Sequence, residues 1–102
     1  MTTTQKRIAW VTLRDDRGPD GSLKSLDAYV EEGGDLVLSG YDRGATVKEF
    51  SGGSHYEYWR RVKREHVPPV LLQLIEDRFS SDVAFHEWRK EKGIPNEFSI
   101  WV

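Results

Sequence analysis

The sequence predicts an α+β fold, in which an antiparallel sheet of about four or five strands comes first and two C-terminal helices cover one face. Three observations support this. Polar and apolar residues alternate up to Val62, and apolar residues recur at helical spacing after Pro69. Paired glycines divide the alternating part into short segments, as hairpin turns do. The length of 102 residues suits a single domain spanning residues 1–102, with a flexible tail over residues 1–6.

The first strands are predicted from alternation and from turn-forming residues. Ile8–Leu13 is rich in β-favouring residues, and the acidic stretch Asp15–Ser22 that follows has the composition of a solvent loop. Leu26–Val30 and Leu36–Leu38 flank a Glu-Glu-Gly-Gly-Asp sequence, which indicates a hairpin. The hairpin tip falls at Gly33-Gly34 or one residue earlier. A short helix over Ser22–Val30 is the alternative to the second strand.

The middle of the chain contains a second group of turns. Gly40–Gly44 and Ser51–Ser54 are predicted turns, and Val47–Phe50 between them is a short strand or one helical turn. His55–Val62 is predicted to be a strand because aromatic residues favour the pleated surface. Its alternation places Tyr56, Tyr58, Arg60 and Val62 on one face, and His55, Glu57, Trp59 and Arg61 on the other.

Two helices and a last strand are predicted for the remainder. A helix over Pro69–Phe79 begins at a double proline, and Ser81 caps a second helix that runs to Lys92. Gly93-Ile94-Pro95 ends that helix, and Phe98–Val102 alternates like a paired strand. The predicted core residues are Val11, Leu13, Leu38, Leu71, Leu74, Ile75, Phe79, Trp88 and Ile100.

Composition excludes some chemistry and weakens the case for other kinds. The chain has no cysteine, so disulfides, thiolate metal sites and cysteine nucleophiles are excluded. Its beginning is polar, without the apolar stretch of a signal peptide, and no apolar run is long enough to span a membrane. We therefore expect a cytoplasmic location. The net charge of −2 is too small to indicate a class of partner.

No motif predicts catalysis, a cofactor or a bound metal. His55 and Glu57 share a strand face, but no third group that would orient a general base is apparent. The three histidines have no metal-ligand spacing, and the acidic residues between Asp15 and Asp20 lack a calcium-loop pattern. Gly40–Gly44 lacks the Gly-Lys-Ser/Thr ending of a phosphate loop. We expect no catalytic residue, no cofactor and no metal ligand.

The aromatic and basic segment Tyr56–Arg64 permits two interpretations. Rings on a sheet with flanking cations are how single-stranded nucleic acid is bound, by stacking and phosphate neutralisation. The overall acidic balance and the lack of an RNP-type motif argue against that function. Tryptophan, tyrosine and arginine are also the residues most enriched at protein–protein hot spots.

A pattern between Asp35 and Tyr58 adds a resemblance. It consists of Asp35-Leu-Val-Leu-x-Gly-x-Asp-x-Gly44, then Glu49-Phe50, then Tyr56-Glu-Tyr58. With the double-proline helix and Gly93-Ile94-Pro95, it resembles the layout of small uncharacterised bacterial or phage single-domain proteins over roughly the last two-thirds of the chain. The resemblance implies a stand-alone domain and assigns no catalytic residue.

The leading functional prediction is a non-catalytic, protein-binding domain of the immunity-protein, antitoxin or inhibitor kind. Alternation prevents all the large side chains of the His55–Val62 strand from facing one core. Exposed rings beside arginine are more often retained for contact than by chance, and Trp59 with Arg61 is the expected exposed pair. The predicted binding residues are Asp42, Arg43, Tyr56, Glu57, Trp59 and Arg61. A single-stranded nucleic-acid-binding module that uses Tyr56–Arg64 is the alternative.

Overall fold

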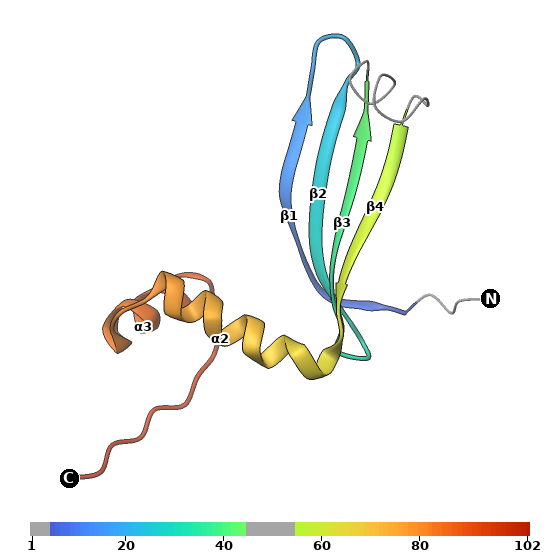
Figure 1. Ribbon diagram of the computed structural model, residues 1–102. Helices are drawn as coiled ribbons and strands as arrows, with labels where there is room; N and C mark the ends of the chain where they lie inside the picture. The colour runs from blue at the N-terminus through green and yellow to red at the C-terminus, as the bar shows by residue number, and fades with distance from the viewer. Residues whose placement is uncertain (1–4, 45–54) are drawn as a thin grey trace. The chain divides into compact units, whose positions relative to one another are not determined.

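The computed structural model describes residues 5–44 and 55–102. The chain divides into two compact units, Met1–Pro68 and Pro69–Val102, which are described separately. The first unit contains a four-stranded antiparallel sheet, and two C-terminal helices follow it in the sequence (Figure 1). The predicted α+β fold is therefore confirmed. The packing of the helices on one sheet face stays a prediction.

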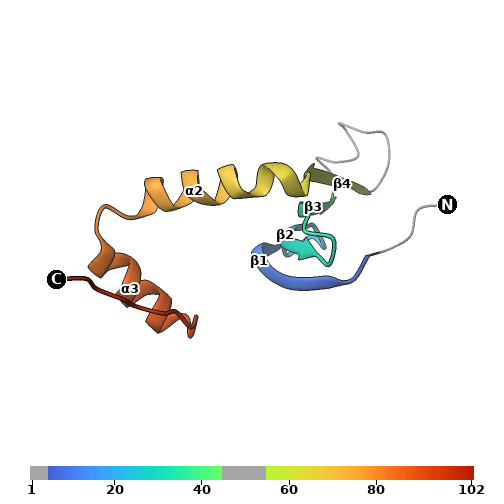
Figure 2. The same ribbon diagram turned by 90° about the horizontal axis from the view of Figure 1, so that it is seen from below.

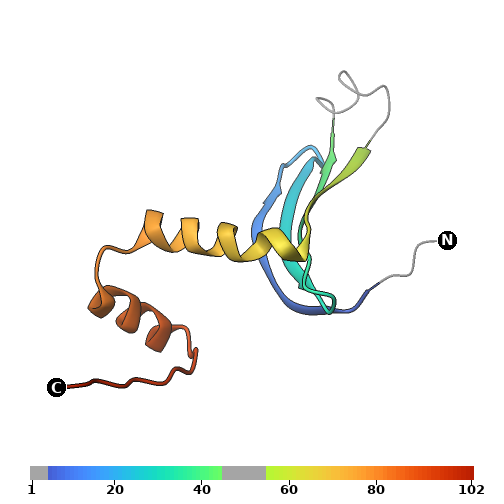
Figure 3. The ribbon, with the colours of Figure 1, turned by 60° about the horizontal axis from the view of Figure 1, so that its bottom comes forward.

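The sheet is a meander in which every strand pairs with its neighbour in sequence. The strands are β1 (Arg7–Arg17), β2 (Leu23–Glu31), β3 (Leu36–Arg43) and β4 (His55–Val62). Their spatial order is β1-β2-β3-β4, and all three pairings are antiparallel (Figure 3). Among the strands of the described residues, β1 and β4 are therefore the two edge strands.

The turn between β2 and β3 settles the hairpin register. Val30 lies opposite Leu36. The backbone N–H of Glu31 donates to the carbonyl of Asp35 at 3.0 Å, and that of Gly34 donates to the carbonyl of Glu31 at 2.8 Å. Gly34 has a φ of 98°, a conformation that glycine adopts without a steric penalty. The alternative of a helix over Ser22–Val30 is wrong.

Two stretches predicted as loop or turn are strand. β1 continues through Asp15–Arg17, where its charged side chains face solvent and the backbone still pairs with Lys24 and its neighbours. β3 continues through Gly40–Arg43, and Gly40 lies directly opposite Tyr58. Both predictions failed because charge and glycine were taken as signals of a turn, whereas a strand with one solvent side tolerates both.

The edge strands differ in regularity. The pairing of β1 with β2 shifts register between Arg7 and Ala9 and again between Thr12 and Arg14. The pairing of β4 with β3 runs without a shift from His55 to Val62. β1 is therefore an irregular edge strand and β4 a regular one.

The helices confirm the predicted positions within two residues at each end. After a short 3₁₀ turn, η1 (Arg64–His66), the helices are α2 (Val67–Arg78) and α3 (Asp82–Glu91), which a sharp bend separates (Figure 2). The Ser81 hydroxyl accepts a hydrogen bond from the backbone N–H of Ala84 at 3.1 Å, as an N-cap does. Phe79, Phe85 and Trp88 form an aromatic cluster with ring centroids 5.4–6.0 Å apart.

The predicted C-terminal strand is not formed. Residues 95–102 have no regular secondary structure, and Trp101 is 96% exposed. Alternation alone does not make a strand, because a strand needs a neighbour that completes its hydrogen-bond ladder. The other weak prediction, Val47–Phe50, lies outside the described residues.

The buried positions lie in the middle strands of the sheet. Val37 is 0% exposed and Tyr29 is 7% exposed, and neither was among the predicted core residues. Five predicted core residues are more than half exposed, so the prediction is wrong for them: Val11, Leu13, Leu71, Leu74 and Ile100. The hydrophobic pattern identifies which side chains are apolar. It does not show which strands have a neighbouring strand on both sides, and those are the strands that hold the buried residues.

Two residues of the predicted flexible tail over residues 1–6, Gln5 and Lys6, are hydrogen-bonded to the sheet. The backbone N–H of Gly33 donates to the side-chain oxygen of Gln5 at 3.0 Å, and that of Glu32 donates to the carbonyl of Lys6 at 2.8 Å. Gln5 and Lys6 are therefore bound to the β2–β3 turn. Among the described residues, none of the helices has the length and apolar character needed to cross a membrane.

Candidate functional site

The predicted binding strand is β4, and its register with β3 assigns each side chain to a face. Glu57, Trp59 and Arg61 lie opposite Tyr41, Ser39 and Val37, on what we call the tryptophan face. Tyr56 and Tyr58 lie opposite Asp42 and Gly40, on what we call the tyrosine face. The predicted division of β4 into two faces is confirmed by this register.

Trp59 is a large exposed side chain at the β4 end of the tryptophan face. It is 61% exposed, although it lies on a strand of the sheet. The residue directly opposite is Ser39, whose small side chain gives the indole little to pack against. An exposed indole on an edge strand is available for contact with another molecule.

Arg61 is held in place by two carboxylates from the β2–β3 turn. Its Nη1 donates to Glu31 and, at 3.0 Å, to Asp35, and its Nη2 donates to Glu31 at 3.4 Å. Glu31 is 8% exposed, so its charge is paired where water is scarce. The hydrogen bonds to Glu31 and then to Asp35 raise the pKa of Arg61. Arg61 is therefore an ordered side chain whose charge is already compensated.

Asp35 joins the sheet to the residues that follow it. It accepts a hydrogen bond from the backbone N–H of Arg64 at 2.8 Å, and Lys63 lies 3.5 Å away. The bond from Arg64 is the largest cause of the lowered pKa of Asp35, and Arg61 and Lys63 lower it further. A carboxylate that accepts an amide hydrogen bond is stabilised in its charged form.

The tyrosine face is built on a glycine. The Tyr58 ring lies against Gly40, where a Cβ atom would come within 2.0 Å of the ring. Tyr56 donates its hydroxyl to Asp42 at 3.0 Å, which is the largest cause of the raised pKa of Tyr56. The two tyrosine rings are 5.8 Å apart. The face is therefore an ordered layer of rings.

The six predicted binding residues do not form one surface. Glu57, Trp59 and Arg61 share the tryptophan face, whereas Tyr56 and Asp42 share the tyrosine face. Arg43 lies opposite His55 at the far end of the tryptophan face, where its Nε donates to the carbonyl of Gly21 at 3.2 Å. The structure therefore brings together two sets of predicted residues on opposite sides of the sheet.

Sequence reasoning missed the partners of Arg61. Glu31 and Asp35 precede it by 30 and 26 residues, and no local pattern connects them. The β2–β3 hairpin was the available signal. Carboxylates at its turn lie beside the C-terminal end of β4, the next strand, because β4 pairs antiparallel with β3. Within the described residues, no cluster of three or more His, Asp or Glu side chains is arranged to hold a metal ion.

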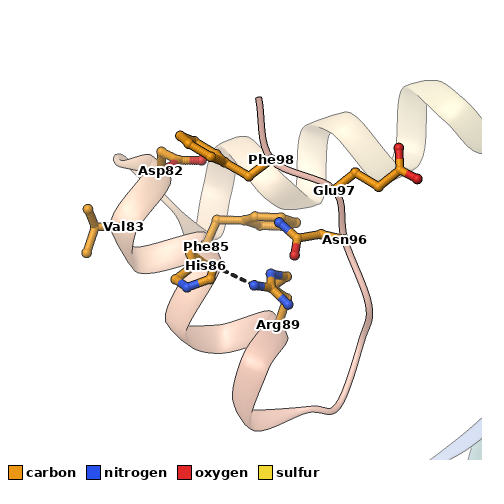
Figure 4. A pocket seen from close by; sticks show the side chains of 8 residues that line it. All are labelled: Asp82, Val83, Phe85, His86, Arg89, Asn96, Glu97 and Phe98. Atoms are coloured by element: carbon orange, nitrogen blue, oxygen red, sulfur yellow. Dashed lines mark hydrogen bonds between the residues drawn. The ribbon is translucent and has the colours of Figure 1, made fainter. Parts of the chain in front are cut away.

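The largest cavity described lies in the second unit. It has a volume of about 580 Å³ and is bounded by α3 and the segment after it (Figure 4). Arg89 fixes that segment, because its Nη1 donates to the carbonyl of Ile94 at 3.0 Å and its Nη2 lies 2.6 Å from His86 Nδ1. The lining mixes acidic, basic and aromatic side chains, so the cavity selects no single class of ligand.

Comparison with family models, with curated proteins and with solved structures finds no match. The resemblance to small bacterial or phage proteins therefore rests on the sequence pattern alone.

Proposed function

We propose that the chain is a non-catalytic protein-binding domain whose contact surface is the edge strand β4 with its tryptophan face. The observation that carries the proposal is the 61% exposure of Trp59 on that strand. Tryptophan is the residue type most often found at hot spots, where burial of a large ring supplies much of the binding energy.

The surroundings of Trp59 support a preformed contact surface. Arg61, two residues along on the same face, is fixed by Glu31 and Asp35 before any partner arrives. A side chain that is already ordered loses little conformational entropy on binding. The ion pairs therefore hold the surface around Trp59 in the conformation that a partner would bind.

The position of β4 at the sheet edge adds a second source of affinity. From Glu57 to Val62, no strand of the described residues pairs with the outer side of β4, where an edge strand presents backbone N–H and C=O groups. An extended segment of a partner can pair with these groups while its side chains meet those of the sheet face. Trp59 and Glu57 would then contact the side chains of the added segment.

The nucleic-acid alternative receives less support from the geometry. The three rings of the aromatic segment are divided between two faces of β4, because Tyr56 and Tyr58 lie on one face and Trp59 on the other, so no one surface offers all three for base stacking. The charge of Arg61, the cation nearest to Trp59 on its face, is compensated by two carboxylates. A protein partner fits both observations better.

The test compares two exposed tryptophans on the same face of the sheet. Trp59→Ala should weaken binding to a partner captured from the native host by about 2 kcal/mol or more, about 30-fold, with little change in melting temperature. Trp10→Ala is the matched control, because Trp10 is 67% exposed and lies on the opposite edge strand, β1. Equal loss from both variants would contradict the assignment to β4.

A gel shift with single-stranded DNA and RNA at low salt distinguishes nucleic-acid binding from protein binding. Retarded bands that disappear as salt rises and that Arg60→Ala weakens would favour nucleic acid over protein. Unfolding of Trp59→Ala would show that the indole is part of the folded core, and the proposal would then fail.

A further inference from the structure

The two edges of the sheet differ in how readily they accept another strand. β1 shifts register twice against β2, and such irregularities make an edge a poor template for pairing. β4 pairs with β3 without a shift over its whole length. The segment from His55 to Val62 also contains no proline or lysine, the residues that commonly block an edge. Among the strands of the described residues, β4 is the more regular outer strand, and the pairing proposed below uses its residues from Glu57 to Arg61.

The sequence of β4 is complementary to itself when two copies run antiparallel about Trp59. In that register Glu57 lies opposite Arg61 of the partner copy, and Arg61 lies opposite Glu57 of the partner copy. Trp59 faces its own equivalent across the two-fold axis. On the other sheet face, Tyr58 lies opposite Arg60 of the partner copy. Opposite charges and aromatic pairs in such positions stabilise antiparallel strands.

The neighbouring registers lack this complementarity. In one continuous sheet, residues that lie opposite each other must point to the same face. The two-fold axis therefore has to pass between the two copies of one residue, because an axis between successive residues would pair side chains of opposite faces. An axis at Tyr58 places Arg61 opposite His55 and leaves Glu57 opposite Trp59, without an opposite-charge pair. An axis at Arg60 places two arginines opposite each other, which is unfavourable. Of these three registers, only the one with its axis at Trp59 has an opposite-charge pair on one face and no like-charge pair on the other.

We propose that the partner of β4 is a second copy of this chain, paired antiparallel through the β4 edges about Trp59. The result is one continuous sheet of two meanders joined at the two-fold axis. This proposal rests on the proposed function, because it names the partner of the same surface. Homodimers with two-fold symmetry are the commonest protein assemblies, and they use the same patch on both copies.

The charges around Arg61 are already balanced within one copy. Arg61 and Lys63 together balance Glu31 and Asp35, and Arg64 donates to Asp35 through its backbone N–H. Glu57 of the partner copy would therefore join an existing network of charges, and the Trp59 rings would supply the apolar contact of the pairing. A single pair of short strands lies at the small end of the range of interface sizes, so dissociation in the micromolar range is expected.

Sedimentation equilibrium of the full chain tests the assembly. The expected result is a reversible monomer–dimer equilibrium, with the dimer predominant at about 0.5 mM. Glu57→Arg places like charges opposite each other twice and should raise the dissociation constant at least about tenfold. Thr12→Arg is the control, because it places an arginine on the same sheet face on β1 and should leave the dimer intact.

Cross-linking tests the register. The chain has no cysteine, so Trp59→Cys introduces one thiol per copy. Directly opposed residues in antiparallel strands are about 4.5–5.5 Å apart between Cα atoms, which a disulfide can bridge. Mild oxidation should link Trp59→Cys into a dimer. Glu57→Cys should stay unlinked, because its equivalents are four residues apart along the strand, about 13 Å.

The outcomes separate this proposal from the proposed function. A chain that is monomeric at every concentration, or a dimer dissociated by Thr12→Arg and not by Glu57→Arg, overturns pairing through β4. If such a chain still binds a different protein through Trp59, the proposed function stands and only the identity of the partner is wrong. Linking of Glu57→Cys in preference to Trp59→Cys overturns the register.

Discussion

Gly40 supports the tyrosine face by having no side chain, and replacing it with alanine tests that role. Gly40 lies in the middle of the sheet, opposite Tyr58, and its backbone is not in the positive-φ region. Alanine can therefore adopt the same conformation. A Cβ atom would nevertheless lie 2.0 Å from the Tyr58 ring, so the ring has to leave its position.

Two opposing effects set the size of the change. Tyr58 is 40% exposed, and a fully buried tyrosine covers about 150–250 Å², so about 90–150 Å² is covered here. At about 25 cal/mol per Å², this area corresponds to about 2–4 kcal/mol, of which roughly half is lost if the ring leaves Gly40. Alanine regains about 0.5–1 kcal/mol, because glycine loses more backbone entropy in a strand. The net expectation is destabilisation by about 0.5–1 kcal/mol.

Urea unfolding followed by circular dichroism measures this free energy for wild type and Gly40→Ala. The sign should reverse in a Tyr58→Ala background, where no ring opposes the new methyl group. There the same substitution should stabilise the protein by about 0.5–1 kcal/mol. Stabilisation by Gly40→Ala in the wild-type background would refute the reasoning, since the ring would then be free to move without loss.

Two further predictions follow from buried and charged side chains. Val37→Ala should lower the free energy of unfolding by about 2 kcal/mol, because Val37 is 0% exposed. Val11→Ala, at a position that is 53% exposed, should change it by less than about 0.5 kcal/mol in the same urea titration. The backbone N–H of Arg64 lowers the pKa of Asp35 below its ordinary value of 3.8. The charged Asp35 therefore stabilises the folded state fully above pH 3.8, and this stabilisation is lost as the pH falls through the lower pKa of the folded state. Melting temperatures of Asp35→Asn should therefore fall less steeply than those of wild type below about pH 4, and parallel curves would contradict the role of this carboxylate.

The sequence predicted the faces of β4 correctly because the two-residue period of a strand is local. Trp59 and Arg61 follow it whatever the neighbouring strands are. The extent of β3 was missed for a non-local reason. Glycine at Gly40 suggested a turn, but its function depends on Tyr58, which only the register of another strand brings opposite.

The candidate site could be predicted in part for the same reason. The exposure of Trp59 was expected from alternation, whereas the fixing of Arg61 by Glu31 and Asp35 depends on contacts across the sheet. In the C-terminal segment, the sequence predicted a strand that is not formed. Phe98–Val102 has the pattern of a strand, but no strand in the described part of the chain pairs with it.

The unequal connections of the meander determine how it opens. Residues 32–35 join β2 to β3, whereas residues 44–54 join β3 to β4. Closing the longer connection costs about 0.9 kcal/mol more in chain entropy, since each doubling of length adds about 0.6 kcal/mol. The ion pairs of Arg61 to Glu31 and Asp35 act against this cost, because they tie the end of β4 to the shorter turn. We expect β4 to join the folding sheet last, so its backbone amides should exchange with solvent sooner than those of β2, and high salt should widen that difference.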